Sequence, residues 1–274
     1  MASDIKEART EAAGLSTRYL EQGQGKPVVL VHGGGAGADS WGNWRISIPL
    51  LAAQGFRVLA VDMVGFGDTA KPDPANFEYS QDARTRHLVG VIEALDLRDA
   101  VLVGNSMGGL TSMGATLAVP DRVDKLVLMG SAGLASEITP ALMPILNYDF
   151  TPEGMRKLIS SLTNQGFDAS EEMVQYRWKR SIDDETRKAY SATMAWVKQQ
   201  GGLKFDEDVI ASVKHKTLVI GGKQDLIVPL DKAYRFLELI ERSWGYIIPN
   251  CGHWAMIEYP EEFAGALTHF IKNA

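Results

Sequence analysis

The stretch Ala100-Val-Leu-Val-Gly-Asn-Ser-Met-Gly-Gly-Leu110 joins an apolar run to a serine flanked by glycines. Residues 101–103 are apolar without polar alternation, which predicts a central parallel strand buried on both faces. After Ser106, apolar residues recur every three or four positions until Pro120, which predicts a helix. The intervening G-x-S-x-G is typical of a strained strand-to-helix turn that lifts the serine hydroxyl above the sheet. A turn that merely contains a serine is the alternative, and the flanking strand and helix favour a functional one.

Composition excludes several classes of partner. The 274 residues include 28 basic and 34 acidic side chains, a net charge of −6, and no basic block, so a nucleic-acid partner is not expected. Residues 1–7 lack the apolar core of a signal peptide, and no run approaches the roughly 18 apolar residues of a membrane span. The single cysteine, Cys251, cannot form an internal disulfide and is expected to be a small buried hydrophobe. The sequence therefore predicts a cytoplasmic protein without a membrane partner.

Around the central stretch, predicted strands alternate with predicted helices. An antiparallel pair within residues 9–21 comes first, with Gly14 at its turn and residues 16–20 alternating between outside and inside. Further strands are predicted at 27–31, 56–62, 123–129, 217–221 and near 246–248, and helices at 80–95, 230–241 and 260–272. This alternation predicts an α/β fold with a mostly parallel central sheet flanked by helices.

The alternation stops between residues 135 and 204. This segment holds helix-like amphipathic stretches at 153–162, 171–180 and 185–197, separated by prolines and a glycine. We interpret it as an all-helical lid inserted into a core of residues 1–134 and 205–274. Open α/β sheets bind ligands at the carboxyl ends of their strands, so the lid is expected to cover that edge.

Two glycine-rich loops follow predicted strands. His32-Gly-Gly-Gly-Ala-Gly37 could bind phosphate, bind an oxyanion or simply turn, but it lacks the Gly-Lys-Ser/Thr ending of a phosphate loop. A His-Gly-Gly-Gly loop instead supplies one backbone N–H to an oxyanion hole, and the residue after the nucleophile, here Met107, supplies the second. The other loop, Gly65-Phe-Gly-Asp-Thr-Ala70, matches a dinucleotide fingerprint, but the prolines of residues 71–74 prevent the required helix. We interpret it, with Asp62, as a structural turn.

Three side chains follow different strands in the order that a serine triad requires on such a sheet. Ser106 needs a base, His253, and His253 needs a carboxylate, Asp225, to fix its tautomer and stabilise the imidazolium. The rival base is His32, expected instead to hydrogen-bond the backbone of its own loop. The rival acid is Asp231, one turn into the next predicted helix. A further histidine, His87, is expected on a helix surface.

Serine at the turn limits the chemistry to attack on a carbonyl. Epoxide hydrolases and haloalkane dehalogenases need an aspartate there to form an ester with an alkyl carbon. No histidine or carboxylate cluster has the spacing of metal ligands, so neither a metal nor a cofactor is expected. The residues themselves therefore indicate an acyl-transfer hydrolase without naming its substrate.

Nearly the whole chain resembles the meta-cleavage product hydrolases, carbon–carbon bond hydrolases of the α/β-hydrolase superfamily that act in bacterial degradation of aromatic rings. The motifs are His32-Gly-Gly-Gly-Ala-Gly with Trp41-Gly-Asn43, Gly-Asn105-Ser106-Met107-Gly-Gly, Arg177-Trp178 and Gly252-His253-Trp254. The resemblance implies cleavage of the C5–C6 bond of 2-hydroxy-6-oxohexa-2,4-dienoates. The products would be 2-hydroxypenta-2,4-dienoate and a carboxylic acid.

The resemblance also implies roles in binding. A guanidinium fork with amide donors suits a planar anionic head. Arg180, three residues from Arg177 on the same helix face, is an alternative carboxylate ligand. The implied substrate residues are Arg177, Asn105 and Asn43 on the C1 carboxylate and 2-oxo group, Gly34 and Met107 as N–H donors to the C6 oxyanion, Trp254 against the dienoate, and Gly35.

Other expectations are less specific. Members of this family often pair, which implies a homodimer. An aryl C6 substituent is favoured over a small alkyl one, and core or pocket positions are both open for the apolar lid residues Met143, Ile145, Leu146, Met155, Leu158 and Trp196. The alternatives are a carboxylesterase or lactonase with the same triad, and a ligand receptor that keeps the fold without turnover.

Overall fold

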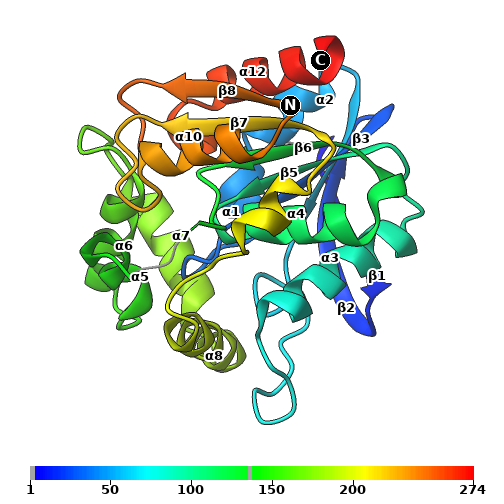
Figure 1. Ribbon diagram of the computed structural model, residues 1–274. Coiled ribbons are helices and arrows are strands. Elements are labelled where there is room, and N and C mark those ends of the chain that lie inside the picture. Colours follow the sequence, from blue (N-terminus) through cyan, green and yellow to red (C-terminus); the bar gives the residue numbers. More distant parts are fainter. Residues whose placement is uncertain (1–3, 135–137) are drawn as a thin grey trace.

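The computed structural model describes residues 4–134 and 138–274. Among these residues the chain forms one eight-stranded sheet with helices on both faces (Figure 1). The predicted start of the insertion at residue 135, and the first three residues of the amino-terminal segment, lie outside the described residues. The strands are β1 (Lys6–Ala12), β2 (Leu15–Gln22), β3 (Lys26–Val31), β4 (Phe56–Val61), β5 (Ala100–Asn105), β6 (Val123–Met129), β7 (Lys216–Gly222) and β8 (Ser243–Ile248).

Twelve α-helices and two short 3₁₀ helices connect these strands in the described part of the chain. They are α1 (Ser40–Trp44), α2 (Ser47–Ala52), α3 (Gln81–Ala94), α4 (Met107–Ala118), η2 (Pro120–Arg122), η3 (Pro140–Leu142), α5 (Met143–Leu146), α6 (Pro152–Leu162), α7 (Glu171–Ser181), α8 (Asp184–Gln199), α9 (Glu207–Ala211), α10 (Leu230–Leu239), α11 (Ala255–Glu258) and α12 (Pro260–Asn273). No helix in this part of the chain is long and apolar enough to cross a membrane.

The sheet has the order β1-β2-β4-β3-β5-β6-β7-β8. Strands β1, β2 and β4 pair antiparallel, and every pair from β4–β3 to β7–β8 is parallel. Helices α3 and α4 pack together on one face, and α2 and α12 pack together on the other (Figure 1). Because the strands from β3 onward run parallel, their carboxyl ends meet at one edge, and the loops that follow them lie close together.

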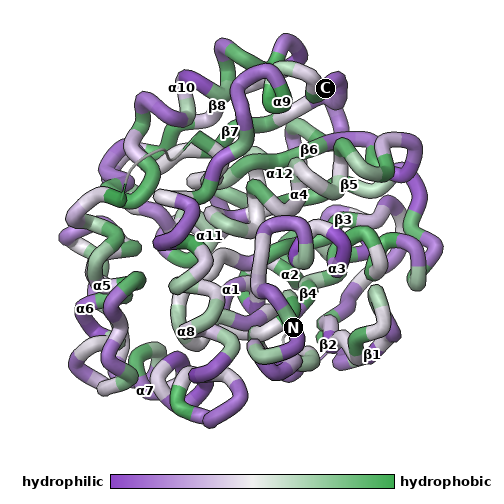
Figure 2. The backbone as a smooth tube through the Cα atoms, turned by 60° about the horizontal axis from the view of Figure 1, so that its bottom comes forward, coloured by the Kyte–Doolittle hydropathy of each residue, from purple (hydrophilic) through white to green (hydrophobic). Residues whose placement is uncertain are grey.

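The central elements β5 and α4 have continuous apolar sequences because they are buried on all sides. All six residues of β5 are buried, and α4 is buried on every side from Met107 to Thr116. Figure 2 shows hydrophobic segments gathered along the central strands and hydrophilic ones at the periphery. The predicted inside–outside alternation of residues 16–20 is wrong, because Thr17, Arg18, Tyr19 and Leu20 are all buried. Arg18 is buried because Asp62 pairs with it at 3.0 Å.

The helical segment between β6 and β7 returns to the sheet close to where it leaves. The Gly133 N–H donates to the Leu203 carbonyl, and the Phe205 N–H donates to the Gly133 carbonyl, both at 3.0 Å. Helices α5–α8 gather at one end of the sheet (Figure 1). Ser170 and Asp183 cap α7 and α8 with their side chains, which explains where these two helices begin.

Candidate active site

Ser106 occupies a strained turn between β5 and α4. Its φ is +56° and its ψ is −122°, a conformation that costs free energy and persists only where surrounding structure enforces it. Backbone hydrogen bonds fix the turn on both sides, from Ser106 N–H to the Met129 carbonyl and from Ala132 N–H to the Ser106 carbonyl. A Cβ at Gly108 would lie 2.4 Å from the Val31 carbonyl oxygen, so only glycine fits there. The turn has the geometry of a nucleophile elbow.

His253 and Asp225 form a buried pair beside this turn. The His253 Nδ1 donates to Asp225 Oδ2 at 2.7 Å. The other carboxylate oxygen accepts the backbone N–H groups of Ile227 and Val228 at 2.8 and 2.9 Å, which fixes the orientation of the carboxylate. His253 Nε2 has no hydrogen-bond partner among the described residues. The pair therefore leaves the Nε2 lone pair of His253 available as a base.

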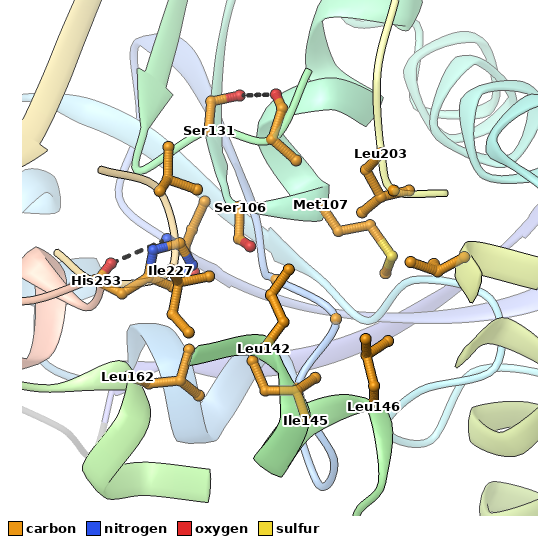
Figure 3. Close-up of a pocket in the computed structure, with 18 of the residues that line it drawn as sticks. Ser106, Met107, Ser131, Leu142, Ile145, Leu146, Leu162, Leu203, Ile227 and His253 are labelled. Carbon is orange, nitrogen blue, oxygen red and sulfur yellow. Dashed lines mark hydrogen bonds between the residues drawn. The ribbon is translucent and has the colours of Figure 1, made fainter. Parts of the chain in front are cut away.

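A cavity of about 300 Å³ lies above Ser106 and His253, between the sheet edge and the helical insertion (Figure 3). Every predicted site residue except Asp225 contributes to its wall, and Asp225 reaches it through His253. Its wall combines a few polar groups with many apolar side chains. Its described apolar lining includes Leu134, Leu142, Ile145, Leu146, Leu162, Met194, Val197, Leu203, Ile227 and Val228.

Arg177 is a buried cation in the cavity wall. It comes from α7, is 1 % exposed, and its guanidinium lies 4.2 Å above the Trp254 ring. Its Nη2 donates to Asn43 Oδ1 at 2.9 Å, and its Nη1 has no partner within the described residues. Burial lowers the pKa of Arg177 to about 10, so the group stays charged at neutral pH. A buried cation with an unused donor at a cavity wall is a site for an anion.

The two alternatives raised by the sequence have other partners. Arg180 lies 3.1 Å from Asp39 and 2.8 Å from Asp68, and it does not line the cavity. Asp231 is exposed at the cavity mouth, where it pairs with Lys232. The cavity wall thus includes Arg177 and not Arg180, and the carboxylate that binds His253 is Asp225 and not Asp231.

Asn105 is placed differently from a simple anion ligand. It lines the cavity and is fully buried, but its Nδ2 donates to the backbone carbonyls of Met129 and His253 at 3.2 and 3.4 Å. Asn105 therefore ties the end of β6 to the histidine loop. In Asn43 the amide oxygen is occupied by Arg177, so its NH2 group remains the donor available to a ligand.

The glycine loop lies against the elbow. A Cβ at Gly34 would lie 2.9 Å from the Met107 sulfur, so the two residues expected to supply oxyanion donors are in contact. His32 is buried below them, donates through Nδ1 to the Gly33 carbonyl at 2.7 Å, and accepts the Met63 N–H at Nε2. Burial lowers the pKa of His32, which keeps the ring neutral. His32 supports the loop and has no free nitrogen to act as a base.

The histidine loop is also bonded to the helical insertion. The His253 N–H donates to the carbonyl of Leu162, the last residue of α6, at 3.0 Å. The carboxylate of Glu258 accepts the N–H of Gly252 at 3.0 Å and the N–H of Asn164 at 2.8 Å. The end of α6 and the base are therefore held together by backbone contacts.

The structure separates the apolar insertion residues into two groups. Ile145 and Leu146 line the cavity, whereas Met155 and Leu158 are buried in the core. Met143 is 42 % exposed, and Trp196 lies against the Arg84 guanidinium. Most remaining apolar wall residues come from loops and helix ends, such as Leu203 and Ile227, where no sequence periodicity distinguishes a cavity position from a core one.

No cluster of three or more histidine, cysteine, aspartate or glutamate side chains in the described residues could hold a metal ion. The described site contains a hydroxyl, an imidazole with a free lone pair, an oriented carboxylate and a buried cation. Such a set can carry out nucleophilic attack on a carbonyl of an anionic substrate.

Comparisons with known proteins agree with this geometry. Residues 26–260 match the alpha/beta hydrolase fold family. The chain is 55 % identical over 263 residues to a 2-hydroxy-6-oxo-6-(2'-aminophenyl)hexa-2,4-dienoic acid hydrolase of Metapseudomonas resinovorans, covering 96 % of this chain and 89 % of the relative. It is 36 % identical over 265 residues to a 2-hydroxymuconate semialdehyde hydrolase of Pseudomonas sp. strain CF600, covering 96 % and 93 %.

Among solved structures, a serine hydrolase involved in carbazole degradation superposes with a TM-score of 0.90 at 51 % identity, covering 98 % of this chain and 100 % of that one. Fold and site define a serine hydrolase of the alpha/beta hydrolase class. Within that class, the chain belongs to the meta-cleavage product hydrolases, which hydrolyse a carbon–carbon bond in ring-fission products of aromatic compounds.

Proposed function

We propose that this enzyme hydrolyses the C5–C6 bond of a 2-hydroxy-6-oxohexa-2,4-dienoate that carries an aryl group at C6. The observation that carries the proposal is the make-up of one cavity wall, which combines the buried cation Arg177 with Ser106, His253 and a mostly apolar lining. The anionic head of the dienoate fits the cation, and an aryl C6 substituent fits the apolar lining. The relative that is 55 % identical acts on a substrate with a 2'-aminophenyl group, which favours an aryl substituent.

The proposed reaction has two stages. Arg177 and Asn43 hold the C1 carboxylate and the 2-oxo group while the dienol loses its hydroxyl proton and C5 gains one. Ser106 then attacks C6 as His253 takes its proton, and backbone N–H groups of Gly34 and Met107 stabilise the oxyanion. The C5–C6 electron pair passes into the conjugated 2-oxo system, and the resulting dienolate takes up the proton that His253 holds. The product 2-hydroxypenta-2,4-dienoate then leaves, and His253 is again a free base. Water, deprotonated by His253, hydrolyses the acyl-enzyme and releases the carboxylic acid.

The remaining site residues have supporting roles in this proposal. Trp254 packs against the dienoate, Gly35 forms the adjacent wall, and Asn105 holds the strand and histidine loop on which the head group rests. The segment from residue 135 to 204 is proposed as a lid over a core of residues 1–134 and 205–274. The location of the cavity between that segment and the sheet edge supports this division.

Loss of Arg177 provides the first test. In Arg177→Ala, the substrate carboxylate would be buried without its cation, so kcat/KM on a C6-aryl dienoate should fall about 30-fold, about 2 kcal/mol. The measurement is bleaching of the yellow dienoate chromophore under steady-state conditions. Lys179→Ala is the matched control, because Lys179 is an exposed cation on the same helix. Turnover of p-nitrophenyl acetate, which has no carboxylate, should be unchanged.

The result separates the proposal from its two rivals. A plain esterase or lactonase predicts that Arg177→Ala leaves the preferred substrates unaffected. A ligand receptor predicts single-turnover modification without steady-state bleaching. If the wild-type enzyme bleaches no dienoate, whatever its C6 substituent, the proposed reaction is wrong.

We also propose that the protein is a cytoplasmic homodimer without a nucleic-acid partner. The net charge of −6 and the single buried cysteine support this location and the lack of a polyanionic partner. Light scattering coupled to size-exclusion chromatography measures the assembly, and a mass near 30 kDa instead of twice that value would contradict the dimer.

A further inference from the structure

One buried carboxylate, that of Asp39, joins the core to helix α7. Asp39 is fully buried and precedes α1. Its Oδ1 accepts the Gly42 N–H at 2.6 Å, which caps α1. Its Oδ2 accepts the Tyr176 hydroxyl proton at 2.5 Å and lies 3.1 Å from Arg180 Nε. The two oxygens of one side chain thus bind two different structural units.

Each of these units carries one half of the anion site. Helix α1 carries Asn43, the residue after the capped N–H, and helix α7 carries Arg177, the residue after Tyr176. The Arg177 guanidinium on α7 donates a hydrogen bond of 2.9 Å to the Asn43 amide oxygen on α1. A shift of α7 against α1 would therefore break the pair that is proposed to bind the carboxylate.

Backbone packing also brings α7 close to the glycine loop that precedes α1. Gly37 has a φ of +66°, and a Cβ there would lie 2.0 Å from the Arg177 carbonyl oxygen. The glycine loop and α7 are therefore in direct backbone contact. Asp39 binds α7 at two side chains, one before Arg177 and one three positions after it, which holds that face of the helix toward the cavity.

Asp39 also affects the charge of the site. Burial lowers the pKa of Arg177, and the negative charge of Asp39 opposes part of that shift. Arg180, paired with both Asp39 and Asp68, neutralises this carboxylate in turn. Asp39 does not line the cavity, so it acts on a ligand only through Arg177 and Asn43.

We propose that Asp39 is a positioning residue that aligns Arg177 with Asn43 on the substrate carboxylate. This inference rests on the proposed function, because it assumes that the pair binds the carboxylate of the dienoate. In this role Asp39 affects the affinity for substrate and not the attack at C6. The role also accounts for the presence of Asp39, Tyr176 and Arg180 around Arg177.

The test uses Asp39→Asn, which keeps the size and the oxygen that caps α1 but removes the charge. KM for the dienoate should rise about tenfold, the cost of a misaligned contact to a charged group, while kcat on p-nitrophenyl acetate stays within about twofold. In an Arg177→Ala background the same change should have no further effect on KM. Asp68→Asn, which removes the other partner of Arg180, is the matched control and should leave KM unchanged.

A binding measurement makes the test independent of turnover. Sorbate, an unreactive hexa-2,4-dienoate, should bind to Asp39→Asn about tenfold more weakly by calorimetry, whereas sorbyl alcohol, which has no carboxylate, should bind equally to both proteins. Suppose that Asp39→Asn binds sorbate more weakly than the wild type does, but that the wild type bleaches no dienoate. The positioning role would then be supported and the proposed reaction would be wrong.

Three results would overturn the role of Asp39. One is an equal loss on the ester and the dienoate, which indicates general structural damage. The others are unchanged KM and sorbate affinity, and additive effects of Asp39→Asn and Arg177→Ala. If Asp39→Asn does not fold, as judged by thermal unfolding, Tyr176→Phe removes one of the same hydrogen bonds without changing a charge. Its KM should rise as well, by less than that of Asp39→Asn.

Discussion

At the scale of single residues, the Asp225 carboxylate determines which nitrogen of His253 carries a proton. Its two oxygens have different partners, the backbone N–H groups of Ile227 and Val228 on one side and His253 Nδ1 on the other. Because the N–H groups accept nothing, an asparagine here must direct its oxygen toward them. Its NH2 group would then face Nδ1 and force the proton onto Nε2, which removes the base.

Asp225→Asn should therefore lower kcat by about 10⁴-fold with little loss of stability. Steady-state bleaching measures the first quantity and thermal unfolding the second. Asp231→Asn, at the cavity mouth, is the control and should leave kcat unchanged. Comparable losses in the two variants would contradict the assignment of the acid.

Individual residues also mark where sequence reasoning fails. His87 was expected on a helix surface, and this is wrong, because it is fully buried. Its Nε2 contacts the Thr17 hydroxyl at 2.8 Å, and its Nδ1 accepts the Val64 N–H. Helix periodicity cannot reveal such burial, because the groups that cover His87 come from β2 and from the loop after β4, distant in sequence.

At the scale of elements, this histidine joins α3 to β2 and to the loop after β4. Burial lowers its pKa from 6.5 to about 4. A depressed folded-state pKa contributes stability that is present above pH 6.5 and is lost as pH falls through 4. At pH 4 the loss amounts to about 3 kcal/mol relative to neutral pH.

The variant His87→Gln isolates this contribution, because glutamine offers both a donor and an acceptor but does not titrate in this range. Between pH 7 and 4, the free energy of unfolding should fall by about 3 kcal/mol more in the wild type than in the variant. Urea denaturation at a series of pH values measures the difference. Parallel pH profiles for the two proteins would show that His87 titrates normally.

Elements were the most predictable level of this protein. The strand before Ser106, the helix after it and the order of Ser106, Asp225 and His253 followed from apolar runs and from the rule that parallel strands end at one edge. Short helices such as α1, α2 and α9 were not predicted, because five or six residues are too few for a periodic signal. The Asp39 contacts escaped prediction because Tyr176 lies 137 positions away in the sequence.

At the scale of the whole molecule, the cavity wall is shared between the sheet core and the helical insertion. Binding of an anionic ligand should therefore slow amide exchange both in α7 and in residues 138–146, while α3, on the sheet face, stays unchanged. Hydrogen–deuterium exchange with and without sorbate measures this pattern. Protection confined to the core would contradict a shared site.

The backbone hydrogen bond from the His253 N–H to the Leu162 carbonyl limits the routes by which substrate can enter the cavity. The carboxyl end of α6 cannot move outward without also moving His253 away from Ser106. We therefore expect substrate to enter away from α6, and Ile138, which lines the cavity, is 36 % exposed. An entrance there would leave the catalytic residues in place while substrate enters and products leave. The active site would then need no rearrangement between turnovers.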